Sequence, residues 1–282
     1  MKRINFLVAF FYVAFFLNLA SVSALAYPKA NEIPNTLEMS AREAIVEVAK
    51  SQYGYTQDSL NNTVYAEWAG QSRKAWCSEF VAWCAYQAGI PSYIIPIGIS
   101  SRQYINFYQP KGLFLDFTKS KSEFDEEPSE TEKKNMCSTL KQGDIILIDT
   151  NKNKNDGPEH TCIYISTDST GKIHTIDGNA GGKVDYREYT IDKIYGICKP
   201  DYKKISVRFA GLTQNAQDTK ITLSWHDIPD AAKYRVQQLK DSVWTTVGYP
   251  LSSSFTHKSL TNEKPYKYRI LALINNSWSE PK

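Results

Sequence analysis

The pattern of the chain changes near residue 205, and this change divides the sequence into two units. From about Ile205 onward, short apolar runs follow one another with turn residues between them: "ITLSW", "KYRVQQL", "VWTTVG", "SFTHKSL" and "PYKYRILALI". Regularly spaced short strands are typical of a β-sandwich. Before residue 200, helical periodicity comes first and apolar strands follow, which is the order of an α+β unit. The sequence therefore predicts an α+β domain over 38–200, a linker over 201–204 and an all-β sandwich over 205–282.

The two units also differ in charge. Residues 27–202 contain 19 Lys and Arg against 24 Asp and Glu, a net charge of −5, whereas residues 203–282 contain 12 against 6, a net charge of +6. A basic domain can attract anionic polymers, although a modest excess of lysine is equally the composition of a solvated surface. Both interpretations of the second unit stay open.

The N-terminus has the composition of a secretory signal. A basic "MKR" precedes the apolar "INFLVAFFYVAFFLNLA", and small residues lead to Ala24-Leu25-Ala26. This order predicts a signal peptide over 1–26, followed by a polar lead over 27–37. The apolar run is close to the length that spans a bilayer, so an uncleaved membrane anchor is the alternative. We expect a protein that is secreted or associated with the cell surface.

Export changes how the five cysteines are interpreted. An odd number leaves at least one thiol unpaired within the chain, and in a secreted enzyme that thiol is a candidate nucleophile. None of the cysteine spacings matches a structural zinc site. We therefore expect no metal and no cofactor.

One helical stretch, "RKAWCSEFVAWCAYQAGIPS" (73–92), contains two Trp-Cys pairs seven residues apart. Cys77 lies where the helix should begin. A thiol there meets the positive end of the helix dipole and unpaired backbone N–H groups, which favour the thiolate and can bind an oxyanion. Cys84 lies two turns further on, and we expect a small buried residue there, facing Cys162 across the sheet.

Among the histidines, His160 is the best placed for proton transfer, because it opens the strand "HTCIYIS" directly after a polar loop. His174 lies on the next strand, three residues before Asp177, so the side chains of His174 and Asp177 should point to opposite faces of the sheet. Asp177 and Asn179 share strand parity, so either could accept the imidazole N–H and fix its tautomer. The segment "DGN" could also be no more than a turn.

These motifs together resemble the CHAP family of cysteine, histidine-dependent amidohydrolases and peptidases. The segments "AWCSEFVAWCAYQAGI", "LKQGDIILID", "PEHTCIYIS" and "IHTIDGNAGGKV" follow one another in the family's order. The resemblance covers about 38–200 and implies a papain-like fold with Cys77 as nucleophile, His160 as base and Asp177 as third residue, with Asn179 in support. It also implies peptidoglycan as the substrate.

The charged segment 119–135 lies between the nucleophile and the base in the sequence. It is poor in apolar residues, so we expect a long solvated insertion that is not a catalytic element. In the family that resembles this chain, loops at this place border the substrate groove, so the insertion could change which bond is cleaved.

The basic unit resembles a fibronectin type III domain. Trp225 would be the buried core tryptophan, and Leu260 and Tyr266, six residues apart, match the tyrosine-corner pattern. This fold implies no activity by itself, and a spacer role is the simplest expectation.

The leading hypothesis is a secreted cysteine hydrolase that cleaves an amide bond in peptidoglycan, either the muramoyl–L-alanine amide or a peptide bond of the stem or cross-bridge. The alternatives are a non-catalytic protein that binds cell walls or glycans and a secreted protease that acts on host proteins. The expected partners are peptidoglycan and, through the basic domain, anionic wall polymers. No nucleic-acid partner is expected, and a monomer is assumed.

Overall fold

The computed structural model describes residues 28–36, 38–72, 74–118, 127–151, 156–205, 213–228, 230–262, 264–274 and 276–279. The expected signal peptide, 1–26, lies outside these residues. Within the described ranges no helix is both long enough and apolar enough to cross a bilayer.

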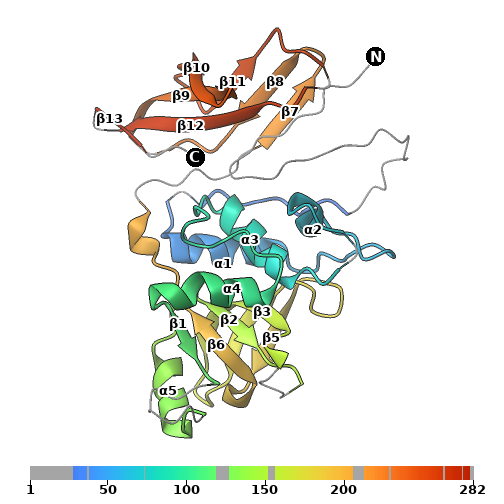
Figure 1. Ribbon diagram of the computed structural model, residues 1–282, viewed down its shortest axis with the longest axis vertical. Helices are drawn as coiled ribbons and strands as arrows, with labels where there is room; N and C mark the ends of the chain where they lie inside the picture. Colours follow the sequence, from blue (N-terminus) through green and yellow to red (C-terminus); the bar gives the residue numbers. More distant parts are fainter. Residues whose placement is uncertain are drawn as a thin grey trace.

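Within the described ranges, the first unit contains a six-stranded antiparallel sheet and five α-helices (Figure 1). The strands lie in the order β1-β6-β2-β3-β4-β5, so β2 and β3 are central. The helices are α1 (Ala41–Ser51), α2 (Val64–Trp68), α3 (Cys77–Gln87), α4 (Ser101–Tyr108) and α5 (Glu130–Ser138). The strands are β1 (Phe114–Asp116), β2 (Ile145–Ile148), β3 (His160–Thr167), β4 (Ile173–Asp177), β5 (Asp185–Tyr189) and β6 (Ile194–Cys198). Short 3₁₀ turns are η1 (Gln109–Lys111), η3 (Ile191–Lys193) and η4 (Tyr202–Lys204).

The central strand β2 is apolar at every position because both faces of the sheet are covered. Ile145 and Leu147 belong to a core that includes residues of α1 and α3. Ile146 and Ile148 point to the opposite face and belong to a second core. Successive side chains of a strand alternate between faces. The run "IILI" is therefore that of a strand buried on both sides.

Helix α1 begins as the sequence predicts. The Ser40 side chain accepts a hydrogen bond from the Glu43 backbone N–H, and the Glu43 carboxylate accepts one from the Ser40 N–H, which completes a capping box. The helix ends at Ser51, and Gln52 is its C-cap.

A buried carboxylate joins the first helix to the centre of the sheet. Asp144, fully buried just before β2, accepts hydrogen bonds from Arg42 of α1 and from Lys199, which follows β6. Gly143 has φ +80°, and a Cβ there would lie 2.9 Å from the Arg42 carbonyl oxygen. The Gly-Asp pair before β2 is thus explained by packing: the glycine permits the close approach and the aspartate neutralises two cations.

Where the structure describes the expected solvated insertion 119–135, from residue 127 onward, most of its residues are exposed, and they include the start of a helix that the sequence analysis did not predict. Ser129 and Glu132 form a capping box, and helix α5 follows from Glu130. Met136 and Cys137 of this helix pack against the second core of the sheet. The capping pattern, a serine with a glutamate three residues on, was present in the sequence but was obscured by the high charge. Residues 119–126 lie outside the described ranges.

The second unit is a β-sandwich of a four-stranded and a three-stranded sheet, with strand orders β10-β9-β12-β13 and β11-β8-β7. This two-sheet arrangement resembles fibronectin type III domains. The strands are β7 (Thr213–Gln217), β8 (Lys220–Ser224), β9 (Ala231–Lys240), β10 (Val243–Gly248), β11 (Ser254–His257), β12 (Lys267–Ile274) and β13 (Ser277–Trp278).

The sandwich core contains the residues that the sequence singled out. Trp225 is 4% exposed, and its ring lies edge-on to Tyr234. The Tyr266 hydroxyl accepts a hydrogen bond of 2.8 Å from the Thr261 backbone N–H, and both Tyr266 and Leu260 are buried in the same core. The tyrosine corner is therefore present.

Candidate active site

Helix α3 begins at Cys77, so the thiol lies in its first turn. Trp76 is the N-cap residue, and its side chain makes no capping hydrogen bond. It is instead fully buried, with Nε1 donating to Gln57 Oε1 at 2.9 Å and its ring stacked on Tyr65. The tryptophan therefore fixes the start of the helix through packing and leaves the backbone N–H groups there uncapped by its side chain.

Buried hydroxyl groups join this helix turn to the strand that carries His160. Ser78 Oγ lies 3.1 Å from Thr161 Oγ1, and Ser101 Oγ of α4 lies 2.7 Å from the same Thr161 oxygen. Tyr104 also donates to the Ser78 carbonyl. Ser78 follows Cys77 and Thr161 follows His160, so these bonds hold the two functional residues as neighbours.

The imidazole of His160 is bound to a carboxylate. His160 Nε2 lies 2.7 Å from Asp177 Oδ2, and the Asp177 side chain is fully buried. His160 also interacts with the Cys77 side chain through hydrogen bonding and charge. Because Nε2 faces Asp177, Nδ1 is the nitrogen left for the thiol.

The charges around His160 favour its protonated form. Burial alone would lower the pKa of the imidazole, but the hydrogen bonds and charges of Asp177 and Cys77 outweigh burial and raise the pKa to about 10. At neutral pH the ring is therefore an imidazolium that can donate one N–H to Asp177 and the other to sulfur. Transfer of the Cys77 proton to a neutral imidazole produces this imidazolium and leaves a thiolate nucleophile.

Two further residues support Asp177, and the sequence reasoning did not identify either. Thr175 Oγ1 donates to Asp177 Oδ1, and the Tyr189 hydroxyl donates to Asp177 Oδ2 at 2.7 Å. Thr175 precedes Asp177 by two residues on β4 and so shares its face. This spacing of two residues could have identified Thr175 from the sequence. Tyr189 reaches the site from β5, whose pairing with β4 was not predicted.

The glycine after Asp177 permits the close contact between β4 and α3. A Cβ on Gly178 would lie 2.3 Å from the Phe80 Cβ, in the first turn of the helix that carries Cys77. No side chain fits there without moving one of the two segments. The "DGN" segment is therefore more than a turn, because it brings the carboxylate strand against the helix start.

Asn179 does not lie where strand parity placed it. Strand β4 ends at Asp177, and Asn179 has a left-handed backbone with φ +59°. Among the described residues, its side chain makes no hydrogen bond to His160. The expectation of shared parity is wrong because the strand stops before Asn179.

The remaining cysteines and histidines have other surroundings. Cys84 is fully buried in the core beneath the helices, and burial raises its thiol pKa well above the ordinary value. Cys162 belongs to the core on the opposite face, so the two thiols do not face each other. All five cysteines are free thiols. His174 lies 3.1 Å from Asp168 and is partly exposed, which agrees with its expected surface position.

Glu79 is a buried carboxyl beside the nucleophile that the sequence reasoning passed over. It lies in the first turn of α3, is 1% exposed, and its Oε2 has no hydrogen-bond partner among the described residues. Burial raises its pKa to about 7, against smaller opposing effects of its own backbone N–H and of Lys74. A neutral Glu79 leaves the positive end of the helix dipole undiminished near Cys77.

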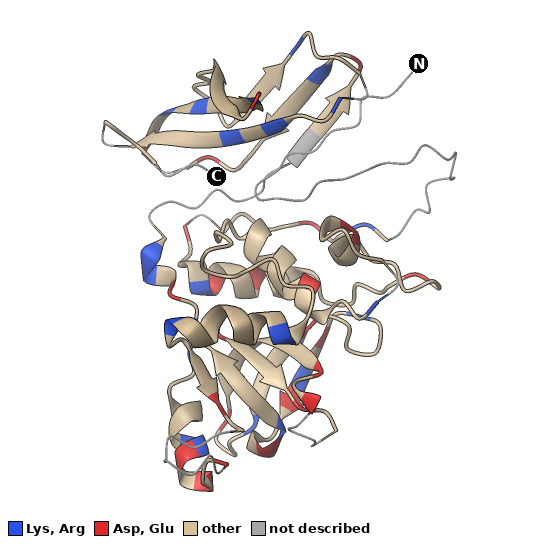
Figure 2. Cartoon of the chain, in the orientation of Figure 1, with Lys and Arg blue, Asp and Glu red and all other residues tan. Residues whose placement is uncertain are grey.

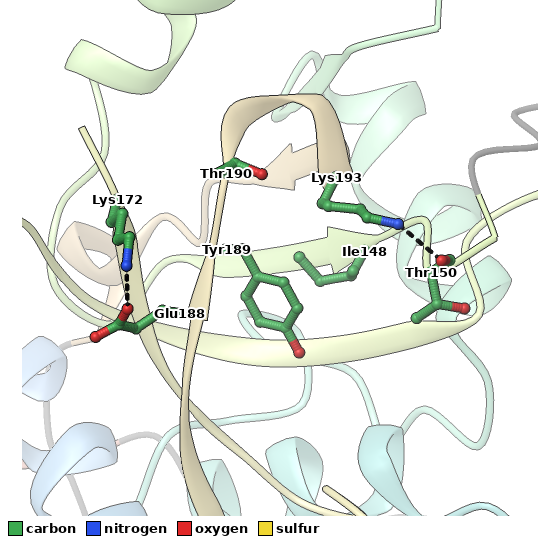
Figure 3. A pocket seen from close by; sticks show the side chains of 7 residues that line it. All are labelled: Ile148, Thr150, Lys172, Glu188, Tyr189, Thr190 and Lys193. Carbon is green, nitrogen blue, oxygen red and sulfur yellow. Dashed lines mark hydrogen bonds and ion pairs between the residues drawn. The ribbon is translucent and has the colours of Figure 1, made fainter. Parts of the chain in front are cut away.

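A cavity of about 480 Å³ lies behind the carboxylate, on the other side of Tyr189. Figure 3 shows the Tyr189 ring at its centre, with an ion pair between Lys172 and Glu188 on one side. On the other side, Lys193 donates to the Thr150 carbonyl. Cys77, His160 and Asp177 do not line this cavity. Tyr189 thus lines the cavity and also donates a hydrogen bond to Asp177.

No group of three or more His, Cys, Asp or Glu side chains among the described residues is arranged to hold a metal ion. The chemistry that the site offers is that of a thiol, an imidazole and a carboxylate. With uncapped backbone N–H groups at the same helix start, this set can attack a carbonyl and stabilise the oxyanion that forms.

No protein-family model matches the chain. Similar solved structures include "Structure of FN3tt mut", which is 16% identical and covers 26% of this chain and 86% of its own, with a TM-score of 0.25. An Fn3-like protein from Clostridium thermocellum is 22% identical and covers 26% of this chain and 81% of its own, with a TM-score of 0.24.

A curated relative, "Titin homolog" of Caenorhabditis elegans, is 31% identical over 81 residues. The match covers 28% of this chain and 0%, to the nearest per cent, of that protein, so the chain spans a negligible part of it. These likenesses assign no chemistry to the site. The function is therefore inferred from the geometry of Cys77, His160 and Asp177.

Proposed function

We propose that the first unit is a CHAP-type cysteine hydrolase with a papain-like fold, which cleaves an amide bond in peptidoglycan. The observation that supports this most directly is the juxtaposition of a thiol at a helix start, an imidazole and a buried carboxylate. Three side chains from α3, β3 and β4 converge, although 100 residues of sequence separate the first from the last. The choice of peptidoglycan comes from the family resemblance.

The reaction would proceed through an acyl-enzyme. The Cys77 thiolate attacks the amide carbonyl carbon, and the backbone N–H groups at the start of α3 bind the oxyanion. As the C–N bond breaks, the His160 imidazolium gives its proton to the leaving amine. A thioester remains on Cys77.

Water completes the cycle. His160, now neutral, accepts a proton from the water molecule that attacks the thioester carbonyl. The C–S bond breaks, the carboxylic acid product leaves, and the imidazolium–thiolate pair is restored. Asp177 keeps the ring oriented throughout, and Thr175 and Tyr189 hold Asp177 in place.

The test compares two cysteine variants of the full chain on purified peptidoglycan. Cys77→Ala should abolish the release of amino groups, since it removes the attacking atom. Cys84→Ala makes the same chemical change in the same helix and should retain activity, because that thiol is buried in the core. Mass analysis of the released fragments identifies the bond.

Two results would contradict the proposal. One is a wild-type protein that releases neither amino groups nor peptides from peptidoglycan. The other is a Cys77→Ala variant that is as active as the wild type. Cleavage of denatured proteins without any action on peptidoglycan would favour a secreted protease instead.

A further inference from the structure

The cavity on the far side of Tyr189 has no part in the proposed reaction. Its volume is about 480 Å³, which lies within the range of about 300–1,000 Å³ that is usual for small-molecule sites. It is lined by residues from the ends of β2 and β5 and from η3. The cavity is therefore large enough for a ligand of its own.

A lysine ammonium is held in place at the cavity wall. Lys193 belongs to η3, and its carbonyl oxygen accepts a hydrogen bond of 2.9 Å from the Asp149 backbone N–H. Its Nζ donates to the Thr150 carbonyl oxygen at 2.8 Å. An ammonium group has three N–H donors, and this bond uses one of them. Lys193 is thus positioned before a ligand arrives and can still donate to an acidic group.

The cavity also has apolar surface next to this cation. Ile148 and the ring of Tyr189 both line it. Figure 3 places the ring between Lys193 on one side and the ion pair of Lys172 with Glu188 on the other. A cation beside apolar surface suits a ligand that carries a carboxylate on a short apolar body.

Tyr189 connects the cavity to the catalytic imidazole. Its hydroxyl donates to Asp177 Oδ2 at 2.7 Å, and the same oxygen lies 2.7 Å from His160 Nε2. Burial is the largest of the effects that raise the pKa of Tyr189 above its ordinary value, so the hydroxyl stays protonated and remains a donor. A ligand that moves the tyrosine ring would therefore alter the carboxylate that orients His160.

We propose that this cavity binds a short peptide through its free C-terminal carboxylate, and that the bound peptide acts on His160 through Tyr189 and Asp177. The carboxylate is bound by Lys193, and the apolar part of the peptide packs against Ile148 and the tyrosine ring. A peptide as the source of the carboxylate rests on the proposed function, because cleavage of an amide bond releases a carboxylate. Binding itself requires no hydrolysis.

The first experiment measures binding by calorimetry to the full chain with Cys77→Ala, so that nothing is hydrolysed. The probe is N-acetyl-alanyl-alanine, and its C-terminal amide is the matched ligand without the charge. The acid should bind at least about tenfold more tightly than the amide, since only the acid makes a charge-assisted hydrogen bond. Acetate and inorganic phosphate lack the apolar body and should not displace the probe.

Two lysine variants in this background locate the site. Lys193→Gln removes the charge and should weaken binding of the acid by about tenfold, while Lys193→Arg should retain it. Charges of both signs are spread over the first unit (Figure 2), so the control must remove a lysine charge elsewhere in that unit. Lys204→Gln does so outside the cavity and should bind like the parent. Thermal unfolding confirms that each variant folds.

The second experiment follows the histidine ring resonances by NMR as the probe is added. The His160 resonances should shift, whereas those of His226 and His257 in the sandwich should not. Tyr189→Phe keeps the ring but loses the hydrogen bond to Asp177. This variant should still bind the probe, and the response of His160 should be lost.

Three outcomes would overturn the inference: equal binding of the acid and the amide, equal binding by Lys193→Gln and Lys204→Gln, or a His160 response that is absent in the parent or undiminished in Tyr189→Phe. Failure of the hydrolase proposal would show separately, as a wild-type protein that releases nothing from peptidoglycan. It leaves these binding measurements interpretable.

Discussion

At the scale of single residues, the site depends on how His160 is held. Its ring has a carboxylate on one nitrogen and the Cys77 thiol as its other partner, and both stabilise the imidazolium. Asp177 in turn receives hydrogen bonds from Thr175 and Tyr189. Each of these bonds fixes an atom that must be in place before the carbonyl arrives, so the site is largely organised without substrate.

This arrangement predicts the pH dependence of hydrolysis. The pKa of His160 is raised from 6.5 to about 10, so the imidazolium persists through neutral pH, and activity should fall as pH rises through about 10. The stability that the raised pKa contributes is fully present below 6.5 and is lost between 6.5 and 10. Profiles of kcat/KM against pH measure the alkaline limb.

The Asp177→Asn variant provides the matching test. It should shift the alkaline limb to lower pH and reduce kcat by about a hundredfold or more, since the carboxylate no longer supports the imidazolium. His174→Gln alters a partly exposed histidine on the same strand and should change neither the alkaline limb nor kcat. An unchanged alkaline limb in Asp177→Asn would contradict the role given to the carboxylate.

At the scale of elements, two segments must meet closely for the site to form. The turn after β4 lies against the first turn of α3, and only a glycine fits at position 178. Ser78, Ser101 and Thr161 make a second connection, between α3, α4 and β3. These contacts determine where the thiol lies relative to the imidazole and the carboxylate.

Gly178→Ala should therefore impair catalysis more than it impairs folding. The added Cβ would meet the Phe80 Cβ at 2.3 Å and push Asp177 away from the helix start. We expect the free energy of unfolding to fall by about 1–3 kcal/mol and kcat to fall about tenfold, with KM less affected. Urea titration and steady-state kinetics measure the two effects.

Gly171→Ala is the control for this change. A Cβ at Gly171 meets no atom within 4 Å, although its φ of +84° makes the substitution strained. It should cost about 1 kcal/mol of stability and leave kcat unchanged. If Gly178→Ala keeps full kcat, the contact with Phe80 does not position the site.

At the scale of the whole molecule, the two units have separate hydrophobic cores. Among the described residues, the sandwich core contains only residues from 221 onward, and the two cores of the first unit end at Ile205. We therefore expect two calorimetric unfolding transitions instead of one.

The tyrosine corner identifies which transition belongs to the sandwich. Tyr266→Phe removes the hydrogen bond from the Thr261 N–H and should lower the stability of the sandwich by about 1 kcal/mol. Only one transition should move, and peptidoglycan hydrolysis should not change. Tyr53→Phe changes a residue that is 55% exposed in the first unit, so it should shift neither of the two unfolding transitions. A single transition that shifts as a whole would contradict independent folding.

Local signals were sufficient for several of these features. The Ser40 capping box, the start of α3 at Cys77 and the Tyr266 corner follow from residues a few positions apart, and the structure contains all three. The same kind of signal at Ser129 was overlooked because the surrounding charge suggested a loop.

Features that depend on distant segments were not predictable in this way. Tyr189 reaches Asp177 only through the pairing of β5 with β4, and the fit of Gly178 depends on Phe80, nearly a hundred residues earlier. The position of Asn179 was predicted wrongly because the alternation of side chains along a strand does not indicate where the strand ends.

The burial of helix α3 has a consequence for redesign. Every residue of this helix except Tyr86 is buried, so the element that carries the nucleophile offers almost no position at which a substitution leaves the packing intact. An attempt to change the bond that the proposed hydrolase cleaves should leave α3 untouched. The changes belong at positions outside α3 whose side chains are already exposed.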